Sequence, residues 1–155
     1  MLSRTHFIFA LFVYLILFSY LDADISNKFL FLIFLLIATF FVDIDSAKSK
    51  IGNRFYLRPL QWIFSHRGFF HTPFAGILFF LIIYYFNAYA GLGFFTGYIL
   101  HLFLDMLTKE GIALFWPLYD KKIGLGIKSG GLLEEIFFVL LLLADIYLFI
   151  IILVR

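Results

Sequence analysis

The chain has 155 residues, and 64% of them are hydrophobic, which excludes an ordinary soluble domain because such domains are closer to half apolar. A net charge of +2 gives no indication of nucleic-acid binding, and the absence of cysteine excludes disulfides, thiolate metal sites and cysteine nucleophiles. The length favours one integral membrane domain over residues 1–155.

Five apolar segments follow one another along the chain. The first, 6–21, comes after a basic residue as in a signal peptide, but it lacks a small-residue cleavage site, so we expect it to remain as a membrane helix. The second, 28–42, is short for a bilayer, which takes about 20 residues. Only NAYAGLG separates the third and fourth, 73–90 and 92–107, which favours a tight helical hairpin. With the fifth, 133–154, they predict an all-α bundle of about five transmembrane helices.

Basic residues are distributed unevenly between the two sides of such a bundle. With five crossings, the N-terminus and the loops 43–72 and 108–132 share one side, which holds every lysine and arginine except Lys28 and Arg155. Cytoplasmic loops carry the excess of basic residues in membrane proteins. We therefore expect a multi-pass protein with a cytoplasmic N-terminus.

This side also collects the histidines and most carboxylates of the polar motifs. The residues expected there are His6, Asp43, Asp45, His66, His71, His101, Asp105, Glu134 and Glu135. Such clustering predicts an active site at the cytoplasmic face. Asp145 instead lies in the middle of the fifth helix, where the sequence indicates no partner for it.

The segment YILHLFLDML places His101 and Asp105 four residues apart, so a helix presents both on one face. Together they can hold one divalent ion. An aspartate in a membrane helix costs about 2.5–3.5 kcal/mol on insertion scales and usually marks function. The alternative is a plain hydrogen bond that joins two helices.

The two aspartates of VDID, Asp43 and Asp45, would diverge by ~200° on a helix. Joint binding of one ion therefore requires a non-helical backbone, or only one of them is a ligand. The alternative is that both are solvated acids at a helix end.

The segment SHRGFFHTPF is more informative. His66 and His71 would diverge by ~140° on one helix, which is poor for joint binding. Thr72 and Pro73 predict a helix that starts immediately after His71. The planar guanidinium of Arg67 suits a phosphate or carboxylate. Interfacial anchoring is the alternative, but it does not explain the two histidines.

Imidazoles and carboxylates without thiols suit a divalent metal, with zinc as the first choice and manganese or iron as alternatives. The number of candidate ligands allows one to three ions. A bound ion would lower the pKa of a water molecule.

The motifs VDIDSAKS, HRGFFHT and GYILHLFLDMLTKEGIALFWPL, in this order, resemble those of the YdjM-like family of membrane-bound metal-dependent hydrolases. The resemblance covers nearly the whole chain. It departs at Ser46, where a histidine is expected, and this removes one ligand or shifts its role. The His-x3-Asp pair is also similar to that of zinc-dependent phospholipase C, which implies a phosphodiester or phospholipid substrate. The resemblance implies metal ligands at Asp43, Asp45, His66, His71, His101 and Asp105, with His6 and Glu134 as outer ligands or a general base.

We therefore expect a hydrolase that uses a metal-activated water on a phosphoester or phospholipid-type substrate at the cytoplasmic face. In this scheme Asp45 or Glu134 is the base, and Arg67 steers the anionic group. Membrane lipid is the expected partner, and the lateral surface of five short helices is large enough for a homodimer.

Three other functions remain open. A metal-free lipid phosphate phosphatase would use Arg58-Pro59 with His101 and Asp105, but its Ser-Gly-His element is absent. A divalent-cation transporter would hold its ligands near the midplane, whereas here they gather at one face. The third is a structural membrane protein whose polar groups only pair with one another.

Overall fold

The computed structural model describes residues 1–46, 49, 52–63 and 67–154. These residues form five long helices, one short helix and three 3-10 turns, and no β-strand is present among them. The elements are α1 (Ser3–Phe18), α2 (Ile25–Phe41), η1 (Val42–Asp45), η2 (Phe55–Leu57), α3 (Arg58–Ile63), η3 (Phe69–His71), α4 (Pro73–Phe86), α5 (Ala88–Leu107) and α6 (Leu132–Val154). The predicted all-α fold is confirmed.

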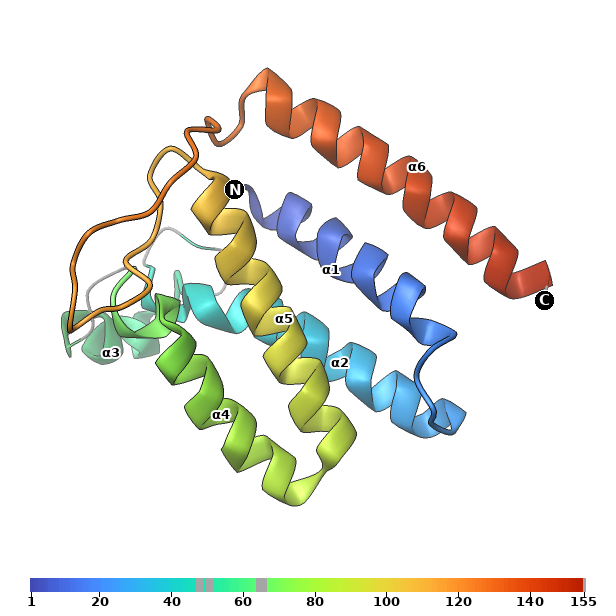
Figure 1. The fold of residues 1–155 in the computed structure, drawn as a ribbon. Coiled ribbons are helices and arrows are strands. Elements are labelled where there is room, and N and C mark those ends of the chain that lie inside the picture. Colours follow the sequence, from blue (N-terminus) through green and yellow to red (C-terminus); the bar gives the residue numbers. More distant parts are fainter. Residues whose placement is uncertain (47–48, 50–51, 64–66, 155) are drawn as a thin grey trace.

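The long helices form a layered bundle. In Figure 1, α1 lies between α2 and α6, while α5 packs on α2 and carries α4 on its other side. Within the described part of the chain, three segments are long and apolar enough to cross a membrane, namely Ile25–Asp45, Ala88–Leu107 and Leu132–Val154. The other two long helices, α1 and α4, have 16 and 14 residues and are shorter than a full span. The molecule is an all-α membrane bundle.

The contact between α2 and α5 depends on two glycines of α5. A side-chain carbon added at Gly93 or Gly97 would collide with the backbone carbonyl of Phe31 or Leu35, respectively. Small residues at such positions let two membrane helices approach closely, and van der Waals contact then holds them together. The α2–α5 pair is therefore a rigid frame for side chains at its polar end.

The predicted tight hairpin between the third and fourth segments is present, but its connection is shorter than NAYAGLG. The connection is Asn87 alone, because α4 ends at Phe86 and α5 begins at Ala88. The Asn87 side chain accepts a hydrogen bond from the Ala90 N–H at 2.9 Å and so caps α5. The glycines of this segment lie inside α5 and serve close packing rather than a turn.

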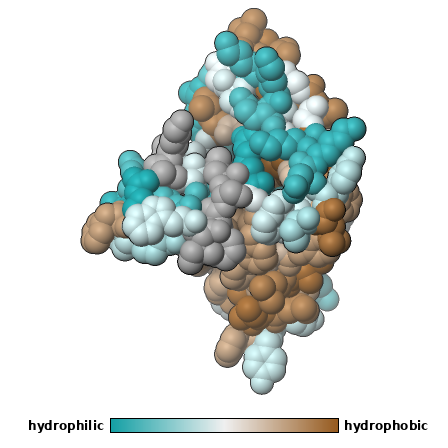
Figure 2. Space-filling view, turned by 90° about the vertical axis from the view of Figure 1, so that its left-hand side faces the viewer, coloured by the Kyte–Doolittle hydropathy of each residue, from teal (hydrophilic) through white to brown (hydrophobic). Residues whose placement is uncertain are grey.

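The polar connections gather at one end of the bundle. The segment 108–131 folds back on the end of α5, where Leu125 and Ile127 donate hydrogen bonds to Met106 and Leu107. Figure 2 looks at the molecule from this side, and it shows hydrophilic residues across the middle and upper part, with hydrophobic residues below them and at the top. The first turn of α1, the end of α2 and the start of α4 all meet here.

Candidate metal centre

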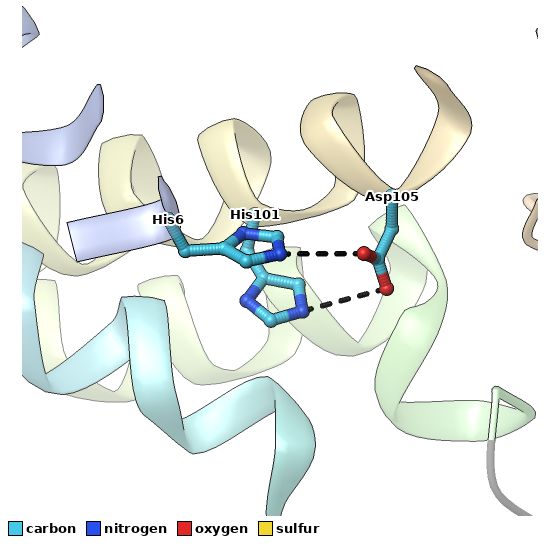
Figure 3. A group of neighbouring side chains, drawn as sticks. All are labelled: His6, His101 and Asp105. Carbon is cyan, nitrogen blue, oxygen red and sulfur yellow. Dashed lines mark ion pairs between the residues drawn. The ribbon is translucent and has the colours of Figure 1, made fainter. Parts of the chain in front are cut away.

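Two residues of α5 and one of α1 form the first half of the centre. His101 and Asp105 are one helical turn apart and only 1% and 3% exposed. His6 stacks its ring on that of His101, with centroids 4.1 Å apart. Figure 3 shows both rings directed at the Asp105 carboxylate. The Nε2 atom of His6 is 3.3 Å from one oxygen, and that of His101 is 3.7 Å from the other.

The second half comes from the turns that follow α2 and precede α4. Asp43 lies in η1, and its Oδ1 is 3.7 Å from Nε2 of His71 and 3.8 Å from Nε2 of His101. His71 is also 3.7 Å from Asp105. Among the residues that the structure describes, two groups of possible metal ligands result, His6–His101–Asp105 and Asp43–His71–His101, and they share His101.

The position of the proton on the His101 ring indicates whether these residues fit a cation. Its Nδ1 is 2.7 Å from the backbone carbonyl of Thr39, and a carbonyl can only accept, so Nδ1 carries the proton. Its Nε2 is then unprotonated and can accept a hydrogen bond or bind a cation. This atom is buried, yet it has no hydrogen-bond partner among the residues described. Its distances to Asp43 and Asp105 are too long for hydrogen bonds. An imidazole fixed in this way by a backbone carbonyl is typical of a metal ligand, so the residues fit a divalent ion.

The 3-10 geometry of η1 separates the two aspartates of VDID around His71. Asp43 faces Nε2, whereas Asp45 has an oxygen 3.4 Å from Nδ1. Asp45 also accepts a hydrogen bond from the backbone N–H of Arg67 at 3.2 Å, and it belongs to neither ligand group. Burial lowers the pKa of His71, but the carboxylates of Asp43 and Asp45 outweigh this effect and raise it to about 9. Two carboxylates that face one imidazole thus favour a positive charge at this place.

His71 is held in place from both sides along the chain. The hydroxyl of Tyr98, on α5, donates to the Phe70 carbonyl at 2.6 Å. Thr72 caps α4 by accepting from the N–H of Ala75, with Pro73 at the first helical position, as the sequence predicted. The ring of His71 is therefore fixed at the junction of η3 and α4.

Arg67 borders a polar cavity of about 200 Å³ at the mouth of the centre. Its backbone is left-handed, with φ 64°, which is unusual for a residue with a side chain. Its guanidinium donates to the Gly111 carbonyl at 2.9 Å and is 3.7 Å from Asp105. Asp43 also lines this cavity, and 26% of its side chain is exposed. The amino group of Met1 contributes a further ion pair to Asp105, at 2.8 Å.

Glu134 is buried beside the centre and is not a member of either ligand group. Its carboxylate accepts hydrogen bonds from the N–H of Leu2, the hydroxyl of Thr5 and the N–H of Gly130, at 2.6, 2.6 and 2.7 Å. These bonds tie the first turn of α1, which carries His6, to the start of α6.

Of the residues predicted from the sequence, the structure brings together His6, Asp43, Asp45, His71, His101 and Asp105, with Arg67 at the rim. His66 lies outside the residues that the structure describes. Sequence reasoning missed Thr39, since the group that it contributes is a backbone carbonyl, which every residue type has.

The model of the YdjM inner membrane protein family matches residues 1–154. The chain belongs to this family. Among curated relatives, "Inner membrane protein YdjM" of Escherichia coli (strain K12) is 36% identical over 84 residues, which cover 48% of this chain and 43% of that protein. The protein of the same name from Shigella flexneri matches to the same extent. "Uncharacterized protein YvsG" of Bacillus subtilis (strain 168) is 35% identical over 114 residues, 69% of this chain and 70% of its own length.

Membership of the YdjM family confirms the resemblance inferred from the motifs, and the three long apolar segments agree with an integral membrane protein. The chain spans less than half the length of the YdjM proteins that it matches. The names of the two YdjM proteins state a membrane location, and none of the three names states a reaction. No solved structure matches the chain.

Proposed function

We propose that this chain is a membrane-embedded, metal-dependent hydrolase that acts on a phosphoester or phospholipid-type substrate. The observation that carries the proposal is the buried Nε2 of His101, which has no hydrogen-bond partner among the described residues and faces the carboxylates of Asp43 and Asp105 at 3.8 and 3.7 Å. Leaving a polar atom unpaired in this way is unfavourable unless a ligand completes the site.

The ion would be held by a set of imidazoles and carboxylates that suits zinc, with manganese or iron as alternatives. When bound, it would supply a Lewis acid and a water of lowered pKa. The proposed ligands are His6, Asp43, His71, His101 and Asp105.

The remaining polar groups divide the other tasks. Arg67 lies at the rim of the cavity and would bind the anionic part of a substrate. Asp45 and Glu134, predicted as bases, are both engaged, Asp45 with His71 and Arg67, and Glu134 with the start of α1. We assign them positioning roles. Asp43 stays a ligand in this proposal, and its carboxylate also reaches the cavity.

A lipid substrate is favoured by the surroundings of the cavity. It lies at the polar end of the bundle, the end that also carries the exposed Trp62 of α3 and the basic Arg54 and Arg58, which suit the headgroup layer. A lipid can therefore reach the cavity laterally without leaving the membrane. The excess of basic residues at this end supports a cytoplasmic location of the cavity, which is part of our proposal.

Metal content is the first test. The purified protein should contain stoichiometric zinc, manganese or iron by mass spectrometry, and His101→Ala should lose most of it. Asp22→Asn, an exposed acid at the other end of the bundle, is the control and should retain the metal. The absence of metal from the wild type after reloading would refute the proposal.

Activity is the second test. The loaded protein should hydrolyse at least one member of a panel of phosphomonoesters, phosphodiesters and phospholipids, and chelation should abolish the reaction. Hydrolysis that resists chelators would instead favour the metal-free phosphatase. In the structure Arg58, which that mechanism needs, donates to Asn53 and Gln61, both at 3.3 Å. Metal uptake by vesicles without hydrolysis would favour the transporter.

Orientation can be tested directly because the chain has no cysteine. A single cysteine at Lys122 should react with a membrane-impermeant maleimide only in inside-out vesicles. A single cysteine at Asp22 should react only in right-side-out vesicles. The reverse pattern would contradict a cytoplasmic site.

A further inference from the structure

A second cavity lies among α1, α2 and α6, with a volume of about 540 Å³. It is almost entirely apolar. Its walls include Leu11 and Leu15 of α1, Phe29 of α2, and Leu142, Asp145 and Ile146 of α6.

This cavity is separate from the metal centre. The residues of α1 that line it, among them Ile8, Leu11 and Leu15, recur at three- and four-residue intervals and so share one face of the helix. His6 is rotated from Leu11 and Leu15 by ~140–180° around α1. The two sites therefore lie on different sides of the same helix.

One carboxyl group in this cavity is unsatisfied. Asp145 is 4% exposed, and neither of its oxygens has a hydrogen-bond partner among the residues described. The other polar side chain in the lining is that of Tyr14, whose hydroxyl donates to the Lys28 carbonyl at 3.3 Å. A buried polar group without a partner is costly, and within a membrane such a group usually marks function.

The depth of Asp145 limits what its partner can be. It lies thirteen residues after the start of α6 and nine before its end, or about 20 Å and about 14 Å along the helix axis. Water and lipid headgroups do not reach this depth in a bilayer about 30 Å thick. The partner must therefore bring its own polar group into the hydrocarbon region.

We propose that the cavity binds a lipid-soluble molecule with one hydrogen-bond donor, a hydroxyl or an amine, and that Asp145 anchors the donor. A volume of about 540 Å³ falls within the range of roughly 300–1,000 Å³ that is common for small-molecule sites. The lining is apolar apart from the side chains of Asp145 and Tyr14, so it suits a slender amphiphile with an apolar chain and one donor.

The two donor chemistries differ in what they require of the carboxyl group. An amine would pair with the carboxylate as an ion pair, whereas a hydroxyl would form a hydrogen bond to either form of the group. Dodecylamine, dodecanol and dodecane therefore distinguish an amine ligand from a hydroxyl ligand, since all three share one chain length and only dodecane lacks a donor.

Native mass spectrometry of the full-length protein, released from lipid nanodiscs, can count each bound probe. We expect one dodecylamine or one dodecanol per chain, at least tenfold more than dodecane at equal concentration. Asp145→Leu should abolish this preference. Leu142→Trp should fill the cavity and prevent binding of either donor. Leu143→Trp is the matched control, because it adds the same side chain to the next residue, which is 59% exposed and does not line the cavity.

Equal binding of dodecane and the donor probes would overturn the proposal, as would unchanged binding in Asp145→Leu or Leu142→Trp. A dimer that must dissociate before any probe binds would also overturn it, since a second copy would then be the occupant. Asp145→Leu replaces a buried acid with an apolar side chain, so it should fold. Asp145→Asn, which keeps a polar group at the same place, is the second variant, and it should retain dodecanol and lose dodecylamine.

Discussion

The helices α5 and α6 are both long and apolar, and each carries an aspartate on a buried stripe. They differ in how much of the helix is buried and in what surrounds the aspartate. About half of the α5 span, 56%, is buried in the protein, against 11% of the α6 span. Asp105 of α5 is surrounded by imidazoles and the Arg67 guanidinium. Asp145 of α6 has no such partner among the residues described.

The difference follows from how closely each helix approaches its neighbours. Gly93 and Gly97 bring α5 against the backbone of α2, and that contact fixes the relative positions of His101 and the turn η1. The helix α6 packs mainly on α1 and exposes most of its other faces. Close packing therefore builds a centre from the protein's own groups, and loose packing leaves a cavity for a molecule from outside.

The largest expected loss of stability comes from breaking the close contact between α2 and α5. In Gly97→Leu the new side chain would meet the Leu35 carbonyl, and backbone on both sides prevents it from moving away. Overpacking of this kind costs roughly 3 kcal/mol. We expect the thermal midpoint in detergent to fall by about 10 °C, with loss of bound metal.

Leu92→Phe is the control, because it enlarges a residue that is exposed on the same helix. It should leave both the midpoint and the metal content unchanged. A stable, metal-loaded Gly97→Leu protein would mean that α2 and α5 do not pack as closely as described.

A smaller loss of stability is expected from substitution of Glu134, the first of the two glutamates at the start of α6. The amide nitrogen in Glu134→Gln faces the N–H of Gly130 in one orientation, and the N–H of Leu2 and the hydroxyl of Thr5 in the other. In either orientation at least one backbone N–H loses its acceptor. Losing one hydrogen bond to a charged group costs about 2 kcal/mol. Glu135→Gln is the matched control, since Glu135 pairs with Arg4 at an exposed position and such pairs contribute less than about 1 kcal/mol.

Chemical denaturation should therefore separate the two variants clearly. Equal stability would show that Glu134 does not anchor α1. Because His6 follows Thr5 directly, we also expect Glu134→Gln to bind metal more weakly than Glu135→Gln.

Much of this molecule could be predicted from residue type and spacing. The mean apolarity predicted a membrane bundle, and the four-residue spacing of His101 and Asp105 placed both on one face, as observed. The sequence Thr72-Pro73 predicted the start of α4, because its chemistry is local to a helix N-terminus. Local rules succeed where the structure depends on neighbouring residues.

The sequence could not distinguish two uses of glycine. A glycine in a turn and a glycine in a helix–helix contact look alike in a sequence, because the partner helix decides which applies. The sequence therefore did not show that Gly91 and Gly93 lie in contacts between helices. The contact of Thr39 with His101 was also invisible, because it joins residues 62 positions apart through a backbone atom. The separate roles of the two aspartates depend on the position of His71, which spacing alone does not give.

The smallest expected effect is a change in metal binding when Asp43 or Asp45 is substituted. It distinguishes a metal ligand from a residue that orients a ligand. Asp45 faces Nδ1 of His71, so Asp45→Asn should keep the ion but weaken its binding about tenfold, at the lower end of what is typical for a partner of a metal-binding histidine. Asp43 faces Nε2 of both His71 and His101, so Asp43→Asn should reduce the amount of metal bound per chain.

Titration with a competing chelator measures affinity, and mass spectrometry measures stoichiometry, so the two outcomes are separable. If Asp45→Asn lost metal stoichiometrically while Asp43→Asn only weakened it, the assignment of the pair would have to be exchanged. The two residues are only two positions apart and both changes are isosteric, so a general loss of stability would affect the two variants alike and would not produce the expected difference.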